Sequence, residues 1–596
     1  GRLQAGKLRI TRAVCLQLGG GVSACFNPDT LRYEAIWDGG FVTTSSRRHG
    51  LIGGLTPVGK LQEPPAQDQL DKPFVYRGYY RHGDRVVFSY RIGDQDYLDA
   101  PSLRDGKFHR VVALAEEHPL KHLTHGGPAQ WKQRFRTEIK QGTAKPYAID
   151  RIGLPFENPW KALIYCAGHD FLPDGTAVIC TFQGDVWHVS NFSGTSKQAT
   201  WRRYASGLSQ AMGIVTVGKD VYVQGRDQIT RLHDLNNDGE ADFYESFSAD
   251  TDVSTFFHAF NFDLQRDGTG NLYYVKSGQY TSHALPGAVI KISPDGKRRE
   301  VHCTGFRTPN GMGILPDGRL TASDNQGSWM PASKVSLLKP GGFYGYVQTH
   351  THKGGLWAPD GGRINHRKVV PPRSFDQPLI WMPQNFDNSS GGQLWVDDPR
   401  WGPLSGHLLH TSFGKGWLYY MMLQEVEGQS QAAIVRLKLN ALTGIHRARV
   451  NPADGQVYAT GLNGWNGGGR KGLSQGHIHR FRYTGKSAQL LTDTKVRHNG
   501  IELKFNFQLD SKSAKNPASY QLKQWNYKWA ASYGSKQYSP KSGKVGQDTM
   551  EISNVKLAKD GRSVLLQIPD IKPANQVKIN LNLQSADAEP FNELVY

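Results

Sequence analysis

The chain has 596 residues, of which 38% are hydrophobic and 21% charged, and its 71 Lys and Arg exceed its 52 Asp and Glu to give a formal net charge of +19. This composition excludes wholesale disorder, and no run approaches the ~20 apolar residues that span a bilayer. The positive charge predicts a polyanionic partner. Because zinc-finger, RNP-type and basic-region motifs are absent, we expect an anionic polysaccharide and no nucleic acid, with a solvated basic surface as the alternative.

The sequence begins GRLQAGKLRI, without an initiator Met or an apolar signal core. Such a start is typical of a processed product, and we expect a secreted, periplasmic or cell-surface protein. Cys15 and Cys25 flank one turn and Cys166 and Cys180 another, so each pair predicts either a disulfide or two buried thiols.

Residues 1–115 alternate apolar and polar side chains in short runs and predict an N-terminal, sandwich-like β-rich domain. Residues 116–150 break this pattern and are interpreted as a linker or covering segment. Residues 496–596 alternate again, at lower glycine density, and predict an Ig-like β-sandwich at the C-terminus.

Residues 151–490 contain a loose repeat, in which a PDG or DG turn precedes an apolar strand and a glycine-containing turn. The units recur at intervals of ~40–50 residues, the length of a four-stranded propeller blade. The expected fold is therefore all-β, with a central β-propeller of six or seven blades. A β-sandwich with insertions is the structural alternative.

The segment DLNNDGEAD places acidic and amide side chains at alternating positions around a glycine, as calcium loops of the EF-hand type do. We expect a structural Ca²⁺ ion there, with an acidic turn free of metal as the alternative. The predicted ligands are Asp234, Asn236, Asp238, Asp242 and Glu245.

Several polar residues lie near the starts of predicted blade strands, which a propeller brings round one axis. His258 and Arg307 have this position in successive repeats, and they are the leading candidates for catalysis, together with His410. Blade-to-blade hydrogen bonding is the alternative role. The same logic predicts that substrate contacts His169, Asn310, Asn325, Asn388 and Lys415.

The segments HAFNFDLQRDGTGNLYYV and GFRTPNGMGILPDGRL resemble strands of glucose/sorbosone dehydrogenase-like β-propellers. The stretches RDQITRLHDLNNDGEADFYE and DDPRWGPLSGHLLHTSFGKG are similar to a subgroup of secreted bacterial proteins, labelled membrane-bound dehydrogenase-like or haem-binding-domain propellers. The resemblance covers roughly residues 10–590. It implies that His258 is a general base and that Arg307 contacts a quinone cofactor, although the family's Arg-Asn-Pro-Gln order reads Arg307-Thr308-Pro309-Asn310 here.

Charge and aromatic content favour a polysaccharide lyase that cleaves a uronate-containing or sulfated, fucoidan-like glycan by β-elimination. Arg307 would neutralise the carboxylate, His258 or His410 would take the proton, and Tyr280 or Tyr346 would protonate the leaving group. The first alternative is a sugar dehydrogenase dependent on pyrroloquinoline quinone (PQQ). The second is a glycan-binding propeller without catalysis.

Overall fold

The structure is a computed structural model that describes residues 1–44, 54–67, 70–254, 256, 258–279, 284–347, 372–463 and 469–596, with two short strands at 356–357 and 363–364. Strands dominate it, and the α-helix in the described ranges is the short α1 (Ser511–Lys515). Among these residues, no helix is both long and apolar enough to cross a bilayer.

Six four-stranded antiparallel units occupy the middle of the described chain. Five are meanders, and the sixth takes its last strand from an earlier segment of the chain. The first three are β15 (Cys166–Phe171), β16 (Ala177–Thr181), β17 (Val186–Ser190) and β18 (Gln198–Ala205); β19 (Gly213–Val217), β20 (Asp220–Gln224), β21 (Gln228–His233) and β22 (Phe243–Ala249); and β23 (Asn261–Arg266), β24 (Leu272–Lys276), β25 (Val289–Ile292) and β26 (Arg299–Cys303). The others are β27 (Met312–Ile314), β28 (Leu320–Asp324), β29 (Ser333–Leu337) and β32 (Ile380–Met382); β33 (Ser390–Val396), β34 (His407–Ser412), β35 (Leu418–Val426) and β36 (Gln429–Leu437); and β37 (Gly444–Val450), β38 (Val457–Leu462), β39 (Gly476–Tyr483) and β14 (Tyr147–Ile152).

The first strands of these units contact one another in a closed ring, in the order β15, β19, β23, β27, β33, β37 and back to β15. The units are therefore arranged as blades of a β-propeller, the fold class that the repeat predicted, and six of them lie in the described part of the chain. Glycines allow the close approach at the axis: a side chain on Gly213 would collide with the backbone of Asp263, and one on Gly391 with the carbonyl of Ile445.

The ring is closed by a strand from far away in the sequence. Strand β14 precedes the first blade but pairs with β39 of the last, with Tyr147 opposite Tyr483 and Ile152 opposite Ile478. Asp150, completely buried on β14, accepts hydrogen bonds from Arg480 at 2.8 Å and from Arg482 at 2.9 Å. The segment interpreted as a linker, 116–150, thus contains β13 (Phe135–Lys140) and most of the closing strand.

The N-terminal strands extend the second blade. Strand β9 pairs with β22, so that blade and N-terminal hairpins form one eight-stranded sheet. A four-stranded sheet packs on these hairpins through rings such as Phe26 and Phe88, whose centroids lie 4.0 Å apart. The larger N-terminal strands are β3 (Val14–Gly19), β4 (Val22–Asn27), β5 (Arg32–Asp38), β8 (Lys60–Gln62), β9 (Phe74–His82), β10 (Arg85–Ile92), β11 (Gln95–Arg104) and β12 (Lys107–Leu114).

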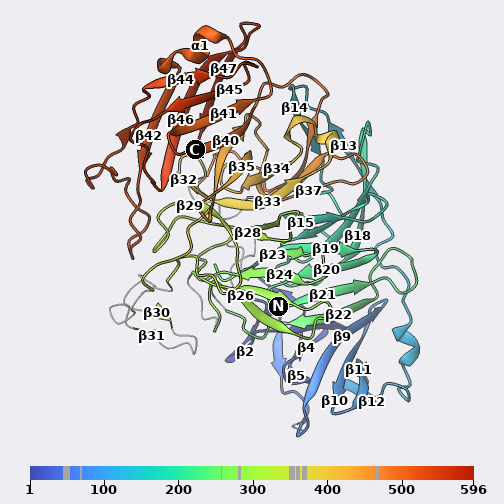
Figure 1. Ribbon diagram of the computed structural model, residues 1–596. Helices are drawn as coiled ribbons and strands as arrows, with labels where there is room; N and C mark the ends of the chain where they lie inside the picture. The colour runs from blue at the N-terminus through green and yellow to red at the C-terminus, as the bar shows by residue number, and fades with distance from the viewer. Residues whose placement is uncertain are drawn as a thin grey trace.

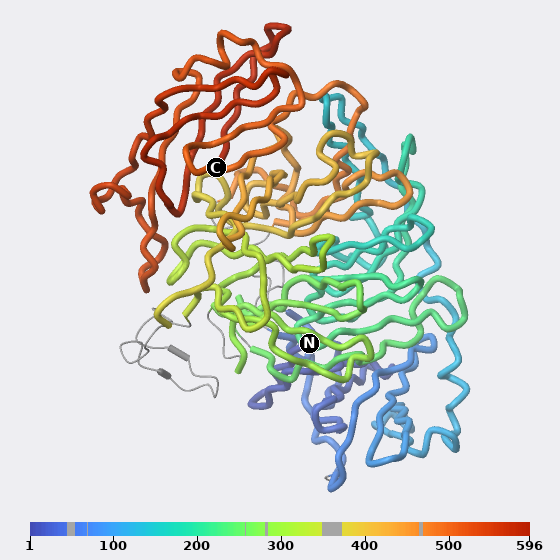
Figure 2. The backbone as a smooth tube through the Cα atoms, in the orientation of Figure 1, coloured from blue at the N-terminus to red at the C-terminus, as the bar shows by residue number. Residues whose placement is uncertain are grey.

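The C-terminal strands extend the fifth blade in the same way. Val595 on β47 pairs with Val435 on β36, and a second sheet of four strands completes a sandwich over a shared apolar core. Figure 2 shows this sandwich in red at the end of the molecule opposite the blue N-terminal strands. Its strands are β40 (Leu491–Arg497), β41 (Gly500–Phe505), β42 (Tyr520–Trp525), β43 (Asp548–Thr549), β44 (Asn554–Leu557), β45 (Ser563–Gln567), β46 (Gln576–Gln584) and β47 (Pro590–Val595).

All five cysteines are free thiols in the structure. Cys15 and Cys25 lie directly opposite each other on β3 and β4, and Cys180 lies one register step from Cys166 on β16 and β15. The sequence therefore placed both pairs on neighbouring strands, and the buried-thiol alternative is the one the structure contains.

Candidate functional site

Consecutive strands of a blade run in opposite directions, so the loops that connect them lie alternately on the two faces of the propeller. We call one of them the mouth face: it carries the connections that enter β19, β23, β27, β33 and β37, and those from the second to the third strand of each blade. His258, Arg307, Asn325 and Lys415 belong to these connections, whereas the acidic loop between β21 and β22 lies on the opposite face. Tyr280 lies outside the described residues.

Arg307 is buried at the mouth face in a fixed position. Its guanidinium donates hydrogen bonds to the Gln326 carbonyl at 3.1 Å and to Thr308 Oγ1 at 3.2 Å. Its backbone N–H and that of Thr308 donate to the carboxylate of Asp324, at 2.7 and 2.8 Å. Asp324 ends β28 and is completely buried, and burial raises its pKa. These four hydrogen bonds hold the connection and the Arg307 side chain in place.

A buried lysine lies below this connection. Burial lowers the pKa of Lys334 to about 8, against the opposing attraction of Asp324. The Lys334 ammonium donates to the Tyr344 carbonyl and lies within 6 Å of the centroids of three aromatic rings. The rings belong to Tyr344, Phe375 and Trp381. These contacts give Lys334 a structural role.

The structure connects the segment carrying His258 with that carrying Arg307. The Ser277 N–H donates to the Phe260 carbonyl, and the N–H groups of Gly278 and Gln279 both donate to the Arg307 carbonyl, each at 2.9 Å. Segment 277–279 therefore bridges the β22–β23 and β26–β27 connections. His258 itself is half-buried two residues before Phe260.

Tyr346 belongs to the same region. Its backbone N–H donates to the Gly305 carbonyl at 2.8 Å. Its ring lies so close to Gly278 that a side chain there would collide with it. Tyr346 is buried, with 7% of its surface exposed, so it lies behind the surface of the mouth face.

Asn310 lies deeper, among groups that hold the blades together. Its amide donates to the Ser390 carbonyl at 3.0 Å and its oxygen is 2.8 Å from His446 Nδ1. Beside it, Arg447 pairs with Asp263 at 3.0 Å, both almost completely buried. This buried ion pair could not be predicted from the sequence, because an aspartate in NFDLQ and an arginine in HRAR carry no signal of their pairing.

His410 and His169 lie within blades. His410 is completely buried on β34, with Nε2 2.9 Å from Asp387 Oδ2 and Nδ1 3.1 Å from Gln393. His169 Nδ1 is 2.9 Å from Thr460 Oγ1, and burial lowers its pKa to about 3. Both rings are thereby engaged inside the protein. The His169 contact joins the first blade to the last, whereas His410 contacts its own blade and the connection that enters it.

Asn325, Asn388 and Lys415 continue the mouth face round the ring. Asn325 donates to the Thr308 carbonyl at 3.1 Å and accepts from the Ser390 N–H at 2.7 Å. Asn388 is buried against Gly414, whose neighbour Lys415 is half-buried.

Two cationic groups meet at this point. Arg470 Nε donates to the Lys415 carbonyl at 2.9 Å, which places a second cation beside Lys415. Within the described residues, no carboxylate pairs with the Lys415 ammonium. Among the described residues, this part of the mouth face therefore carries positive charge from Lys415 that no carboxylate pairs with.

The acidic loop on the other face is occupied by internal hydrogen bonds. Asp234 accepts from the N–H groups of Asp238 and Gly239, at 3.1 and 2.8 Å. Asp242 accepts from the Gly127 N–H at 2.7 Å, and Asn236 donates to the Gly127 carbonyl at 2.6 Å. The loop therefore fastens segment 126–131 to the propeller. In the described ranges, no three His, Cys, Asp or Glu side chains are grouped as metal ligands.

Glu245, predicted to close the calcium loop, lies on β22. Its carboxylate is 2.7 Å from His233 Nε2 and 3.8 Å from Arg231. Both contacts join neighbouring strands of the second blade, because Glu245 on β22 lies opposite Arg231 on β21.

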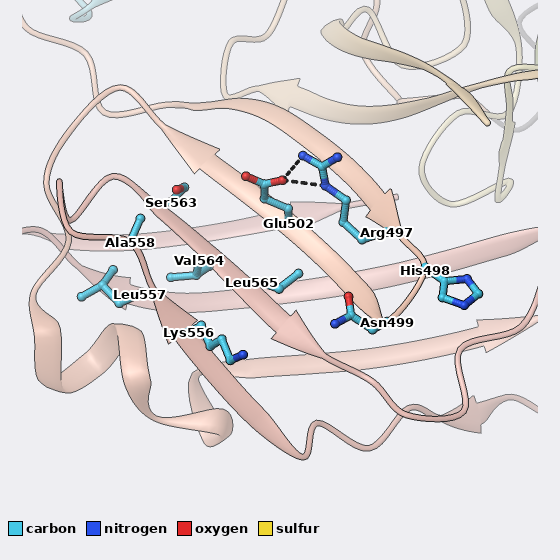
Figure 3. A pocket seen from close by; sticks show the side chains of 10 residues that line it. All are labelled: Arg497, His498, Asn499, Glu502, Lys556, Leu557, Ala558, Ser563, Val564 and Leu565. Atoms are coloured by element: carbon cyan, nitrogen blue, oxygen red, sulfur yellow. Dashed lines mark hydrogen bonds and ion pairs between the residues drawn. The ribbon is translucent and has the colours of Figure 1, made fainter.

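A shallow hollow of about 510 Å³ lies elsewhere, on the outer sheet of the C-terminal sandwich (Figure 3). The predicted site residues do not line it. Its main polar feature is the exposed ion pair of Arg497 with Glu502, 2.8 Å apart. The lining residues are Arg497, His498, Asn499, Glu502, Lys556, Leu557, Ala558, Ser563, Val564 and Leu565.

Comparison with known proteins gives one family match and several structural neighbours. Residues 24–99 match a domain of unknown function, DUF6797. No curated protein matches the chain.

The solved structures that are similar to this chain include sugar dehydrogenases. A glucose dehydrogenase is 16% identical with a TM-score of 0.41, and 59% of this chain and 100% of that chain are covered. For the PQQ-bound aldose sugar dehydrogenase of Streptomyces coelicolor the values are 13%, 0.36, 59% and 98%. For the PQQ domain of pyranose dehydrogenase from Coprinopsis cinerea they are 10%, 0.40, 58% and 97%.

Proposed function

We propose that the protein is a carbohydrate-active enzyme that works at the mouth face and oxidises a sugar with bound PQQ. One observation carries the proposal: a half-buried histidine and several cationic groups lie on the same face, while the buried carboxylates next to them are engaged by backbone N–H groups. His258 supplies the histidine, and Arg307, Lys415 and Arg470 supply the charge.

These groups fit a cofactor that carries carboxylates. An arginine whose fork is fixed in advance suits a planar anion, and Arg307 is fixed by Gln326 and Thr308. Lys415 lacks an internal carboxylate among the described residues and offers a second point of attachment. When bound, PQQ supplies an acceptor for the two electrons that leave the sugar.

The remaining tasks belong to the chain's own residues. His258 takes the proton of the sugar hydroxyl, for which a half-buried imidazole is suited because its ordinary pKa lies near neutrality. Asp324 holds the backbone of residues 307 and 308, so the Arg307 guanidinium does not reorganise on binding. Fixed charges of this kind cost little free energy when the ligand arrives.

The test is reconstitution. The protein is titrated with PQQ in the presence of Ca²⁺, and dye reduction is followed with a panel of aldoses. We expect saturable PQQ binding and sugar-dependent dye reduction, both weakened by Arg307→Lys, which keeps charge but loses the planar fork. Lys559→Ala, which removes a lysine of the C-terminal sandwich, is the matched control. Absence of PQQ binding contradicts the proposal.

A polysaccharide lyase is the second candidate, and the net charge of +19 favours it. Arg307 would then neutralise a uronate carboxylate and His258 would remove the proton. Growth of ultraviolet absorbance at the unsaturated-uronate band during incubation with acidic glycans supports the lyase. Binding of such a glycan should fall with added salt, since charges are screened beyond about 8 Å at physiological ionic strength.

A further inference from the structure

A loop of the C-terminal sandwich reaches the mouth face. Residues 526–547 connect β42 to β43 and leave the sandwich, and Figure 1 shows this part of the chain descending toward β29. The loop pairs with the β28–β29 turn: Trp329 N–H donates to Ala530 at 3.0 Å, and Gly534 N–H donates to Gly327 at 2.9 Å. Tyr533 forms a β-bridge with Ser328 between these two bonds.

The loop is anchored by side chains as well. The Trp529 indole donates to the Gly345 carbonyl at 2.7 Å, and its ring centroid is 5.0 Å from that of Trp329. Gly534 has φ +66° and lies so close to Gln326 that a side chain there would collide with it. Backbone pairing and the half-buried indole of Trp529 together fix the loop on the propeller.

This docking presents one aromatic ring to solvent beside the candidate site. The Tyr533 ring centroid is 5.4 Å from the Arg307 guanidinium carbon, and 65% of the Tyr533 surface is exposed. An exposed tyrosine usually gains entropy from free rotation. Here the backbone on both sides of Tyr533 is hydrogen-bonded to the propeller, and the cation–π contact with the Arg307 guanidinium orients the ring.

We propose that Tyr533 is a sugar-binding residue, which the C-terminal sandwich contributes to the site on the propeller. The inference rests on the proposed function, namely that the mouth face takes a carbohydrate. The C–H face of a pyranose ring is apolar and slightly positive, and it packs on the negative face of an aromatic ring. A ring fixed in advance costs little further entropy on binding.

The stacking contribution is tested by affinity electrophoresis without cofactor. Wild type, Tyr533→Ala and Tyr533→Phe migrate through native gels containing laminarin, xylan, amylopectin, alginate or fucoidan, at low and at high salt. We expect at least one polysaccharide to retard the wild type. Tyr533→Ala should raise the dissociation constant about ten-fold, the scale of a lost aromatic contact of ~1.4 kcal/mol, whereas Tyr533→Phe retains binding. The difference should persist at high salt, because stacking is not a charge effect.

Val545→Ala is the matched control, because it removes an exposed apolar side chain of the same loop, 61% exposed. Equal retardation of Tyr533→Ala and wild type, or no retardation of the wild type by any of the five polymers, overturns the inference. The melting temperatures of the variants must agree within a degree or two for the comparison to count. Tyr533→Phe removes only the hydroxyl group and therefore tests the role of the aromatic ring in a variant that keeps it. If the protein does not bind PQQ but its retardation by a polysaccharide depends on Tyr533, the proposed PQQ-dependent function is overturned and the sugar-binding role of Tyr533 stands.

Discussion

His258 and Arg307 are the residues on which the proposed chemistry depends. We predict that His258→Ala lowers kcat by about 10²–10⁴-fold, the range of a lost general base. Its melting temperature should stay near that of the wild type, since the half-buried ring is not part of the core. Steady-state kinetics of the reconstituted enzyme measure kcat, and a thermal scan measures the melting temperature.

His410→Ala is the informative contrast. It leaves the completely buried Asp387 without its imidazole partner, so it should destabilise the fold by several kcal/mol. If His410→Ala folds normally and loses activity while His258→Ala keeps it, the roles given to the two histidines are reversed.

At the scale of single residues, the sequence predicted that His258 and Arg307 share one face of a propeller, but it did not predict their hydrogen-bond partners. His258 and Arg307 precede apolar strands, and this local signal is enough to place them on one side of a propeller. The engagement of His410 depends on Asp387 and Gln393, which come from other segments. No pattern within HLLHTSFGKG shows those contacts.

At the scale of elements, the blade repeat was predictable because each PDG turn and apolar strand is a local feature. The closing strand was not: β14 has no repeat of its own and pairs with β39, more than 300 residues later. The loop 526–547 is similar, since its docking depends on a turn that lies 200 residues earlier in the chain.

Ring closure by β14 should contribute strongly to stability. Asp150→Asn leaves Arg480, almost completely buried, without its full negative partner, and we predict a loss of about 3 kcal/mol in the free energy of unfolding. Urea denaturation measures it. Asp96→Asn is the control, because Asp96 pairs with Arg91 at the exposed surface, where a pair contributes ~0.5 kcal/mol. Equal effects of the two substitutions would contradict the role of β14.

The acidic loop gives a second prediction at this scale. We propose that residues 234–242 bind Ca²⁺ through Asp234, Asn236, Asp238 and Asp242, so that chelation lowers the melting temperature and added Ca²⁺ restores it. Asp238→Ala should abolish the shift. Glu245→Gln should leave it intact, because the Glu245 carboxylate contacts His233. An unchanged melting temperature after chelation, with no calcium by elemental analysis, would show that the loop only fastens segment 126–131.

At the scale of the whole molecule, buried neutral histidines link stability to pH. Burial lowers the pKa of His169 to about 3, and of His188 and His477 to about 4. Below the ordinary value of ~6.5 the unfolded chain therefore binds protons that the folded chain does not, and stability falls as pH falls from 6.5 toward 4.

The contribution of His169 is isolated by comparing the pH dependence of the free energy of unfolding between His169→Gln and the wild type. Between pH 7 and pH 5, His169→Gln should lose about 2 kcal/mol less than the wild type in the free energy of unfolding, since the replacement does not titrate. The comparison cancels groups that act the other way, such as Asp99, whose pKa burial raises to about 6. Parallel pH profiles of the two proteins would rule out His169 as the source.

The proposed cofactor site and the proposed sugar site both lie at the mouth face of the propeller. The most direct test is a crystal structure of the protein with PQQ, Ca²⁺ and a bound aldose. We predict density for the cofactor at the mouth face, with its carboxylates on Arg307 and Lys415 and the sugar between His258 and Tyr533. A cofactor bound instead in the hollow of the C-terminal sandwich, or a mouth face that stays empty at saturating PQQ, would contradict the central claim.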